Sequence, residues 1–348
     1  MRSVARLPGG VAVARDLTLF RGLTSMQILR AGLLSLSFIC VFAGPVAAQV
    51  SLMPQAVQER LQEVGPGWGK NITANIARTL EVYEPILATA PKSGVKITKD
   101  VAYGPDARHR IDIFQPEGKT GVPVVVFLHG GAYVRGDRSI SPEVYSNVTT
   151  YFARQGFLGI NGTYRLAPAA IWPAAAQDVA QVVKWAKDNA ASFGGDPNRI
   201  YLIGHSAGAT HVATYAFMKT LQEPSGPGVA GIVLMSGRYF FDPHPDDPNL
   251  KNFQAYFGTD PAAYPRQSPI NYVKDAPRIP VFVVVAEYDN PDLDTQGALL
   301  LSAFCERDRA CPRFLRMEKH NHLSMTFQFN TKDELLGREI LEFIARGR

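Results

Sequence analysis

The sequence has few of the residues that mark several protein classes. Three cysteines in 348 residues are too few for a disulfide scaffold or a cysteine-based zinc module. Charged residues make up 19% and hydrophobic residues 46%, which excludes a disordered, collagen-like or coiled-coil chain. Only one segment is apolar enough to meet a membrane, so a protein with several membrane spans is excluded. The length suits one large α/β domain.

The chain also lacks a basic surface stripe, although its formal net charge is +5. Residues 1–48 contain five arginines and one aspartate. The rest of the chain therefore carries a net charge of about +1, with no run of lysine and arginine that could neutralise phosphates. We expect no nucleic-acid partner.

The N-terminus has the three parts of a secretory signal peptide. Arg30 precedes an apolar run over residues 33–43, and small residues lead up to Ala48. An uncleaved membrane anchor would need roughly 20 apolar residues, more than this run provides. We expect residues 1–48 to be a signal peptide cleaved after Ala48, which gives a periplasmic or secreted protein without a membrane span. Met26 suits the start of such a peptide better than Met1.

Two cysteines would remain in the exported chain. Cleavage after residue 48 removes Cys40 and leaves Cys305 and Cys311. An oxidising compartment would allow these two thiols to close a short disulfide loop. Two reduced thiols that happen to be near each other are the alternative.

After the expected signal peptide, residues 49–94 have the pattern of a helical segment. Apolar side chains recur at helical spacing, and Gly65-Pro66-Gly67 separates two such stripes. Over 95–348, short apolar runs alternate with helical patterns, which favours a single α/β domain. Residues 240–277 are rich in proline, aspartate and aromatics and lack periodicity, so we expect an insertion that covers one edge of the sheet.

The apolar runs predict strands that are buried on both faces. They are continuous rather than alternating, which is typical of a parallel sheet covered by helices. The expected strands are 123–128, 157–160, 200–203, 229–235, 280–286 and 313–317. The expected helices between them include 175–189 and 207–221.

One turn between an expected strand and an expected helix has the pattern of a nucleophile elbow. It reads Gly204-His205-Ser206-Ala207-Gly208, a G-x-S-x-G. A sharp turn of this kind exposes the serine and needs small residues on either side, so that strand and helix can approach each other. Ser206 is therefore the candidate nucleophile.

A second glycine-rich turn follows the strand at 123–128. Glycines in His129-Gly130-Gly131 would let main-chain N–H groups point at an oxygen that gains negative charge. We expect the N–H groups of Gly130, Gly131 and Ala207 to form an oxyanion hole, in which one donor is typically worth about 10²–10³ in rate.

A serine nucleophile needs a base and a carboxylate that orients the base. In folds that carry a nucleophile elbow of this kind, the acid follows the serine along the chain, and the base comes last. Four acids, Glu287, Asp289, Asp292 and Asp294, come after the strand at 280–286. Asp289 is the preferred acid, because it lies a short step beyond the strand.

The candidate bases are two histidines that follow the strand at 313–317. His322 leads into the final helical segment and is preferred to His320. Of the other histidines, we expect His205 to pack beside the nucleophile, and His109 and His244 to lie at the surface. No histidine or acid has the spacing of a metal site, and no phosphate-binding loop is present, so we expect neither metal nor cofactor.

In its motifs the chain resembles the α/β-hydrolase superfamily, in particular the hormone-sensitive-lipase-like esterases and the related kynurenine formamidases (arylformamidases). The resemblance covers roughly residues 95–345. It rests on HGGAY at 129–133, YRLAP at 164–168, WPAA at 172–175, FGGDPNRI at 193–200 and GHSAGA at 204–209.

The resemblance implies an α/β-hydrolase fold, with a mostly parallel sheet between helices and a small cap formed by the N-terminal helices and the insertion at 240–277. It implies Ser206 as nucleophile, Asp289 as acid and His322 as base. The implied activity is hydrolysis of small carboxylic esters through an acyl-enzyme.

Two alternatives to ester hydrolysis remain. The elbow and the Asp289-Asn290-Pro291-Asp292 sequence are closer to the arylformamidase branch, which would make a formamide the substrate. Export favours an esterase that acts outside the inner membrane. A binding protein without catalysis is the other alternative, against which the complete set of catalytic residue types argues.

Overall fold

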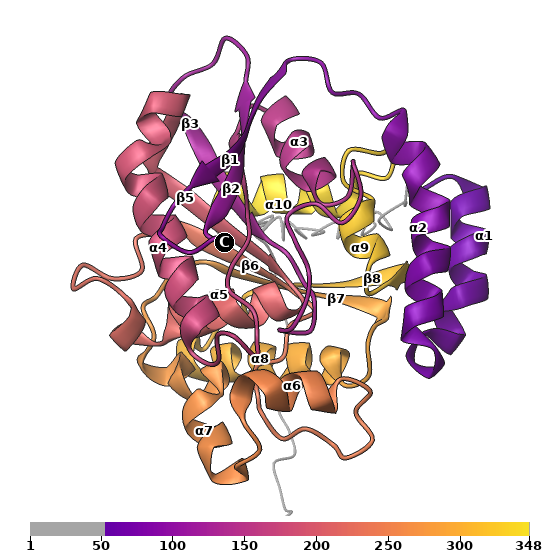
Figure 1. The fold of residues 1–348 in the computed structure, drawn as a ribbon, viewed down its shortest axis with the longest axis vertical. Coiled ribbons are helices and arrows are strands. Elements are labelled where there is room, and N and C mark those ends of the chain that lie inside the picture. Colours follow the sequence, from indigo (N-terminus) through magenta and orange to yellow (C-terminus); the bar gives the residue numbers. More distant parts are fainter. Residues whose placement is uncertain (1–52, 348) are drawn as a thin grey trace, which may run out of the picture. The chain divides into compact units, whose positions relative to one another are not determined.

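An eight-stranded sheet lies at the centre of residues 53–347, the part of the chain that this computed structural model describes (Figure 1). The expected signal peptide and its cleavage site lie outside the described residues. The strands are β1 (Val95–Ala102), β2 (Arg110–Pro116), β3 (Val122–Leu128), β4 (Leu158–Gly162), β5 (Gly195–His205), β6 (Gly231–Met235), β7 (Val281–Tyr288) and β8 (Arg313–Asn321).

The strands are arranged in the order β1-β2-β4-β3-β5-β6-β7-β8. β2 pairs antiparallel with β1 and β4, and every other neighbouring pair is parallel. The mostly parallel α/β sheet expected from the sequence is confirmed. Because the carboxyl ends of parallel strands meet at one edge of a sheet, the loops after β3, β5, β6, β7 and β8 gather on the same side.

Helices cover both faces of the sheet. They are α1 (Gln55–Val64), α2 (Ile72–Ala88), α3 (Ser146–Arg154), α4 (Ala174–Asn189), α5 (Ala207–Phe217), α6 (Leu250–Phe257), α7 (Tyr264–Gln267), α8 (Leu293–Asp308), α9 (Ser324–Phe327) and α10 (Leu335–Arg346). Short 3-10 segments, among them η1 (Gly65–Lys70), connect some of them. Within the described residues, no helix is long and apolar enough to cross a bilayer.

The side chains of β3 show how the sheet forms two cores. Val124, Val126 and Leu128 belong to a core shared with α4, α5 and α8. Val125 and Phe127 point to the opposite face, into a core shared with α3, α10 and the N-terminal helices. Side chains alternate between the faces of a strand, so a strand with a core on each side needs an unbroken apolar run.

Most predicted elements are present, with local differences. The helix predicted to continue to Leu221 ends at Phe217, and a 3-10 turn over Lys219–Leu221 follows it. β1 and β2 were not predicted. β1 is a partly exposed edge strand without an apolar run, and polar residues interrupt the apolar residues of the largely buried β2. The N-terminal stripes form α1 and α2, with η1 at the predicted break.

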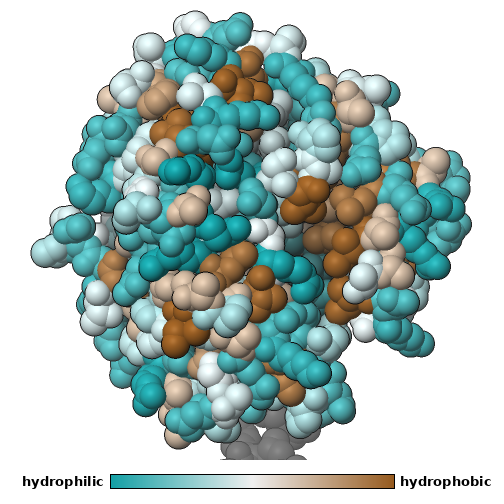
Figure 2. Space-filling model, viewed as in Figure 1, coloured by the Kyte–Doolittle hydropathy of each residue, from teal (hydrophilic) through white to brown (hydrophobic). Residues whose placement is uncertain are grey.

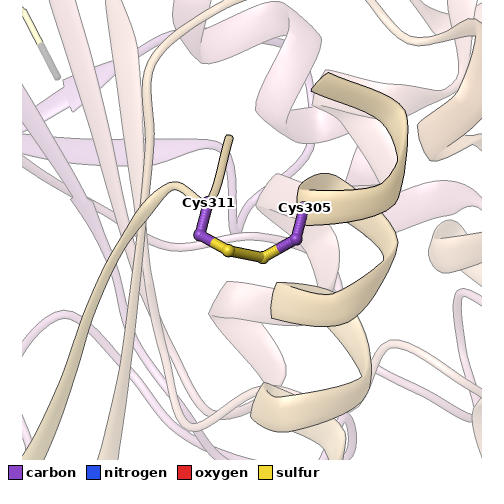
Figure 3. The surroundings of a disulfide bond; sticks show 2 residues. All are labelled: Cys305 and Cys311. Carbon is purple, nitrogen blue, oxygen red and sulfur yellow. A yellow bond between two sulfur atoms is a disulfide. The ribbon is translucent and has the colours of Figure 1, made fainter. Parts of the chain in front are cut away.

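A disulfide joins Cys305 in α8 to Cys311, just before β8 (Figure 3). The two residues are six positions apart. The bond connects the end of α8 to the start of the edge strand that leads to His322. Of the two alternatives that the sequence left open, a disulfide or two reduced thiols, the structure has the disulfide.

We predict a modest effect of removing this disulfide. Closing a loop of this length lowers the conformational entropy of the unfolded chain, which stabilises the folded state by about 2 kcal/mol in the loop-entropy description. The Cys305→Ser/Cys311→Ser variant should therefore show a lower free energy of unfolding by that amount in urea denaturation. A reductant should lower the stability of the wild type to the same value and leave the variant unchanged. Equal stability of variant and oxidised wild type would contradict this account.

Candidate active site

A pocket opens at the carboxyl edge of the sheet and contains most of the predicted site residues. It holds about 1050 Å³, counting the open space at its mouth. Gly130, Ser206 and His322 line it, together with Ile72 and Ile76 from α2. Hydrophobic side chains gather around a hollow beside α1 and α2 in Figure 2, which has the same view as Figure 1.

Ser206 lies at a sharp turn between β5 and α5. Its main chain has φ 56° and ψ −121°, a conformation that residues other than glycine rarely adopt. Such a conformation costs about 1–3 kcal/mol and persists only where the surrounding structure holds it. The main-chain N–H of Ser206 donates to the carbonyl oxygen of Met235, at 2.8 Å, which ties the turn to the end of β6.

The glycines around Ser206 are required by close contacts. A Cβ on Gly208 would lie 2.3 Å from the carbonyl oxygen of Leu128, and one on Gly204 would lie 2.6 Å from Cα of Ala209. A Cβ on Gly130 would lie 2.8 Å from Cβ of Ser206. The main-chain atoms near Gly204 and Gly208, and the Cβ of Ser206 that the main chain fixes, cannot move aside as a flexible side chain can, so each position excludes a larger residue. The small residues that the sequence places around Ser206 are therefore required by the close approach of β5, α5 and the loop after β3.

His322 and Asp289 form a hydrogen-bonded pair beside this turn. Nδ1 of His322 lies 2.6 Å from Oδ1 of Asp289, and both side chains are buried. A carboxylate only accepts, which assigns the ring proton to Nδ1 and leaves Nε2 free to accept a proton. Glu287, on β7, instead accepts a hydrogen bond from the main chain of Lys319. Of the four candidate acids, Asp289 is thus the one that meets His322.

Asp289 is held in a single orientation by its neighbours. Besides His322, the main-chain N–H of Asn290 donates to Oδ1, at 2.9 Å. The hydroxyl of Ser236 and the N–H of Ala286 donate to Oδ2. Donors on both oxygens prevent the carboxylate from rotating, so the ring of His322 has a fixed partner. Ser236 was missed by sequence reasoning, because no motif marks it.

The predicted oxyanion residues line the same pocket. Gly130 and Gly131 follow β3, and Ala207 follows Ser206. Gly131 has φ 142°, a value that favours glycine. Ala132, which the sequence reasoning did not select, also lines the pocket and has φ 48°. Burial raises the pKa of Tyr145, whose side chain also lines the pocket.

Of the predictions for the other histidines, the one for His109 is wrong. His205 is buried as predicted, but its Nε2 also donates to the carbonyl oxygen of His322, at 2.8 Å. The surface position predicted for His109 is wrong: it is 2% exposed, with Nε2 3.0 Å from Oδ1 of Asp178. His244 is exposed. His320 is buried against the hydroxyl of Ser324 and does not line the pocket.

Both segments that the sequence assigns to a cap contribute to the pocket wall. Ile72 and Ile76 of α2 supply an apolar side. The insertion supplies Asp247 and Asn249, and the side chain of Asp247 is 2.5 Å from Nη2 of Arg238 in a buried ion pair. The pocket therefore has an apolar and a polar wall. Among residues 53–347, no group of three or more His, Cys, Asp or Glu side chains could hold a metal ion.

Comparisons with known proteins agree with the fold. A family model described as BD-FAE matches residues 111–303. The esterase LipQ of Mycobacterium tuberculosis is 27% identical over 269 residues, which cover 71% of this chain and 62% of that protein. A hyperthermophilic esterase from the archaeon Pyrobaculum calidifontis has a similar structure, with a TM-score of 0.65 and 23% identity, covering 84% of this chain and 98% of that one.

Other curated relatives are matched over a smaller part. A probable isoprenylcysteine alpha-carbonyl methylesterase of Oryza sativa subsp. japonica is 35% identical over 136 residues, which cover 39% of this chain and 31% of that protein. The chain spans about a third of the length of such relatives.

The buried histidines around the site predict a stability that falls in acid. Burial lowers the pKa of His129 to about 4 and that of His211 to about 3, and lowers the pKa of His205 well below its usual value. Between about pH 6.5 and about pH 4 the unfolded chain therefore binds more protons than the folded one. The free energy of unfolding should decrease as the pH falls through this window, with each histidine contributing up to about 1.4 kcal/mol per pH unit.

Urea denaturation at about pH 7 and about pH 5 measures this loss of stability, and one variant isolates one group. His211 lies among aromatic rings and lines no part of the pocket, so His211→Phe should keep the packing and remove one titrating site. Its stability should fall less steeply with pH than that of the wild type. The same slope in both proteins would refute the assignment of His211.

Proposed function

Because the chain belongs to the BD-FAE family, within the α/β-hydrolase superfamily, we propose that it is a serine hydrolase that cleaves carboxylic esters through an acyl-enzyme. One observation carries the proposal. Ser206, at a strained turn, and His322, hydrogen-bonded to Asp289, line the same pocket. A nucleophile, a base and a group that orients the base are the parts that acyl transfer needs.

In the first half-reaction, Oγ of Ser206 attacks the carbonyl carbon of the ester while Nε2 of His322 takes the hydroxyl proton. The imidazolium is stabilised by Asp289, which keeps the second proton on Nδ1. The tetrahedral intermediate then collapses, the bond to the alcohol oxygen breaks, and His322 gives its proton to the leaving alcohol. Water repeats the cycle on the acyl-enzyme and releases the acid and the free serine.

Main-chain N–H groups would hold the oxyanion of the intermediate. Ala207 supplies one from the first turn of α5, whose N-terminus favours negative charge. Gly130, Gly131 and Ala132 supply the others from the loop after β3.

The walls of the pocket indicate the kind of ester. The isoleucines of α2 suit an apolar acyl or aryl group, whereas Arg238, Asp247 and Asn249 can bond a polar group on the other side. The names of the related proteins, esterases and a methylesterase, favour an ester over the formamide alternative. No observation on this site favours the formamide or a protein without catalysis.

Kinetics on two substrates test the proposal. The purified full chain should hydrolyse a short p-nitrophenyl ester with a higher kcat/KM than N-formylkynurenine. Ser206→Ala should lower kcat by about 10⁴-fold or more while the circular dichroism stays unchanged. Hydrolysis that survives in a folded Ser206→Ala protein would exclude this mechanism. A higher kcat/KM on the formamide would assign the arylformamidase activity instead.

We also propose that the protein acts in the periplasm or outside the cell. The signal-peptide pattern of residues 1–48 supports this, and so does the disulfide between Cys305 and Cys311, since such bonds persist in oxidising compartments. N-terminal sequencing of the protein from its native cells should give Gln49 as the first residue. A cytoplasmic protein that begins at Met1 or Met26 would contradict export.

A further inference from the structure

The N-terminal helices contact both loops that carry the candidate acid and base. In Figure 1, α1 and α2 stand beside the ends of β7 and β8 and next to α9. We propose that the segment Gln55–Ala88, here called the N-terminal clamp, holds Asp289 and His322 in position relative to each other. Trp68 and Thr79 are then positioning residues for the reaction. This inference rests on the proposed function, because it assigns how the same site is kept in order.

The contact on the acid side starts from Trp68. Its side chain is 1% exposed, and Nε1–H donates to Oδ1 of Asn290, at 2.8 Å. The main-chain N–H of that same Asn290 donates to Asp289. Gly65 lies directly on the ring of Tyr288, where a Cβ would be 2.1 Å from a ring carbon. The clamp thus fixes the residues on both sides of the acid.

The contact on the base side goes through Asn321, which is fully buried. Its Nδ2 donates to Oγ1 of Thr79, at 3.0 Å. Its Oδ1 accepts from the main-chain N–H groups of Leu323, at 3.0 Å, and Ser324, at 2.9 Å. Asn321 therefore closes the turn around His322 with one end of its amide and holds α2 with the other.

Hydrogen bonds within the clamp make the two contacts one unit. Nδ2 of Asn75 donates to the carbonyl oxygens of Gly67 and Trp68, at 3.0 and 3.2 Å. The hydroxyl of Thr79, one turn further along α2, donates to the carbonyl oxygen of Asn75, at 2.7 Å. Asn75 and Thr79 are buried. A short chain of bonds therefore runs from the acid loop through Trp68, Asn75 and Thr79 to the base loop.

This connection has a consequence for the reaction. The acid and base lie on separate loops, which follow the paired strands β7 and β8. Beyond these strands, the His322–Asp289 pair and the N–H of His322, which donates to the carbonyl oxygen of Tyr288 at 3.1 Å, join the two loops directly. A shift of about 1 Å in a reacting group can lower a rate by about 10²-fold. Loosening the clamp should therefore lower kcat. A substitution that removes one of these bonds while α2 stays in place should leave KM nearly unchanged, because neither Trp68 nor Thr79 lines the pocket.

Substitutions at Thr79 give the sharpest test. Thr79→Val keeps the shape of the side chain but leaves the buried amide of Asn321 without an acceptor. We expect kcat on the p-nitrophenyl ester to fall about tenfold, with KM within about twofold of the wild type. Thr79→Ser restores the hydroxyl and should restore most of kcat. Thr73→Val is the matched control, because Thr73 is exposed on the same helix.

All assays are run on the full chain, well below the thermal midpoint of each variant, so that unfolded protein does not lower the measured kcat. A kcat of Thr79→Val equal to that of Thr73→Val would overturn the proposal. Should Thr79→Val fail to fold, Trp68→Phe decides: a lower kcat at unchanged KM supports the clamp, and an unchanged kcat overturns it. A wild type without esterase activity would instead refute the proposed function, which keeps the two failures distinct.

Discussion

The main-chain conformation of Ser206 is the constraint on which the rest of the site depends. A residue other than glycine at φ 56° is stable only if the turn on each side is held tightly. Here β5 and α5 approach so closely that Gly204 and Gly208 cannot carry a side chain, and the loop after β3 packs against the serine at Gly130. The conformation of the turn at Ser206 therefore depends on the loop after β3 and on the parallel sheet, and these pack closely only because the turn is sharp.

Hydrogen bonds from buried polar groups hold the loops that carry Asp289 and His322. Asp289 accepts four hydrogen bonds, and His322 is bonded through its ring, its N–H and its carbonyl oxygen. The donor to that carbonyl oxygen is His205, which precedes the nucleophile, so the elbow and the base loop are joined directly. Burial keeps the ring of His205 neutral by lowering its pKa, and a neutral ring adds no positive charge beside His322.

Much of this site could be predicted from the sequence, because its steric demands leave local marks. The glycines of the elbow and of the HGG turn are such marks, and buried parallel strands appear as continuous apolar runs. The positions that the sequence did not predict depend on contacts between distant segments. His109 is polar and lies outside any apolar run, yet Asp178, far along the chain, gives it a buried partner. The bonds of Trp68 and Thr79 are of the same kind, since they join residues more than two hundred positions apart.

The proposed mechanism depends on Ser206 being a nucleophile that His322 activates. Treatment with a fluorophosphonate, followed by peptide mass spectrometry, tests that claim most directly, because such a reagent reacts with an activated serine and not with an ordinary hydroxyl. The account predicts one adduct, on Ser206, and a strongly reduced rate of labelling in a folded His322→Ala protein. An adduct on another residue, or no adduct in the folded wild type, would contradict it.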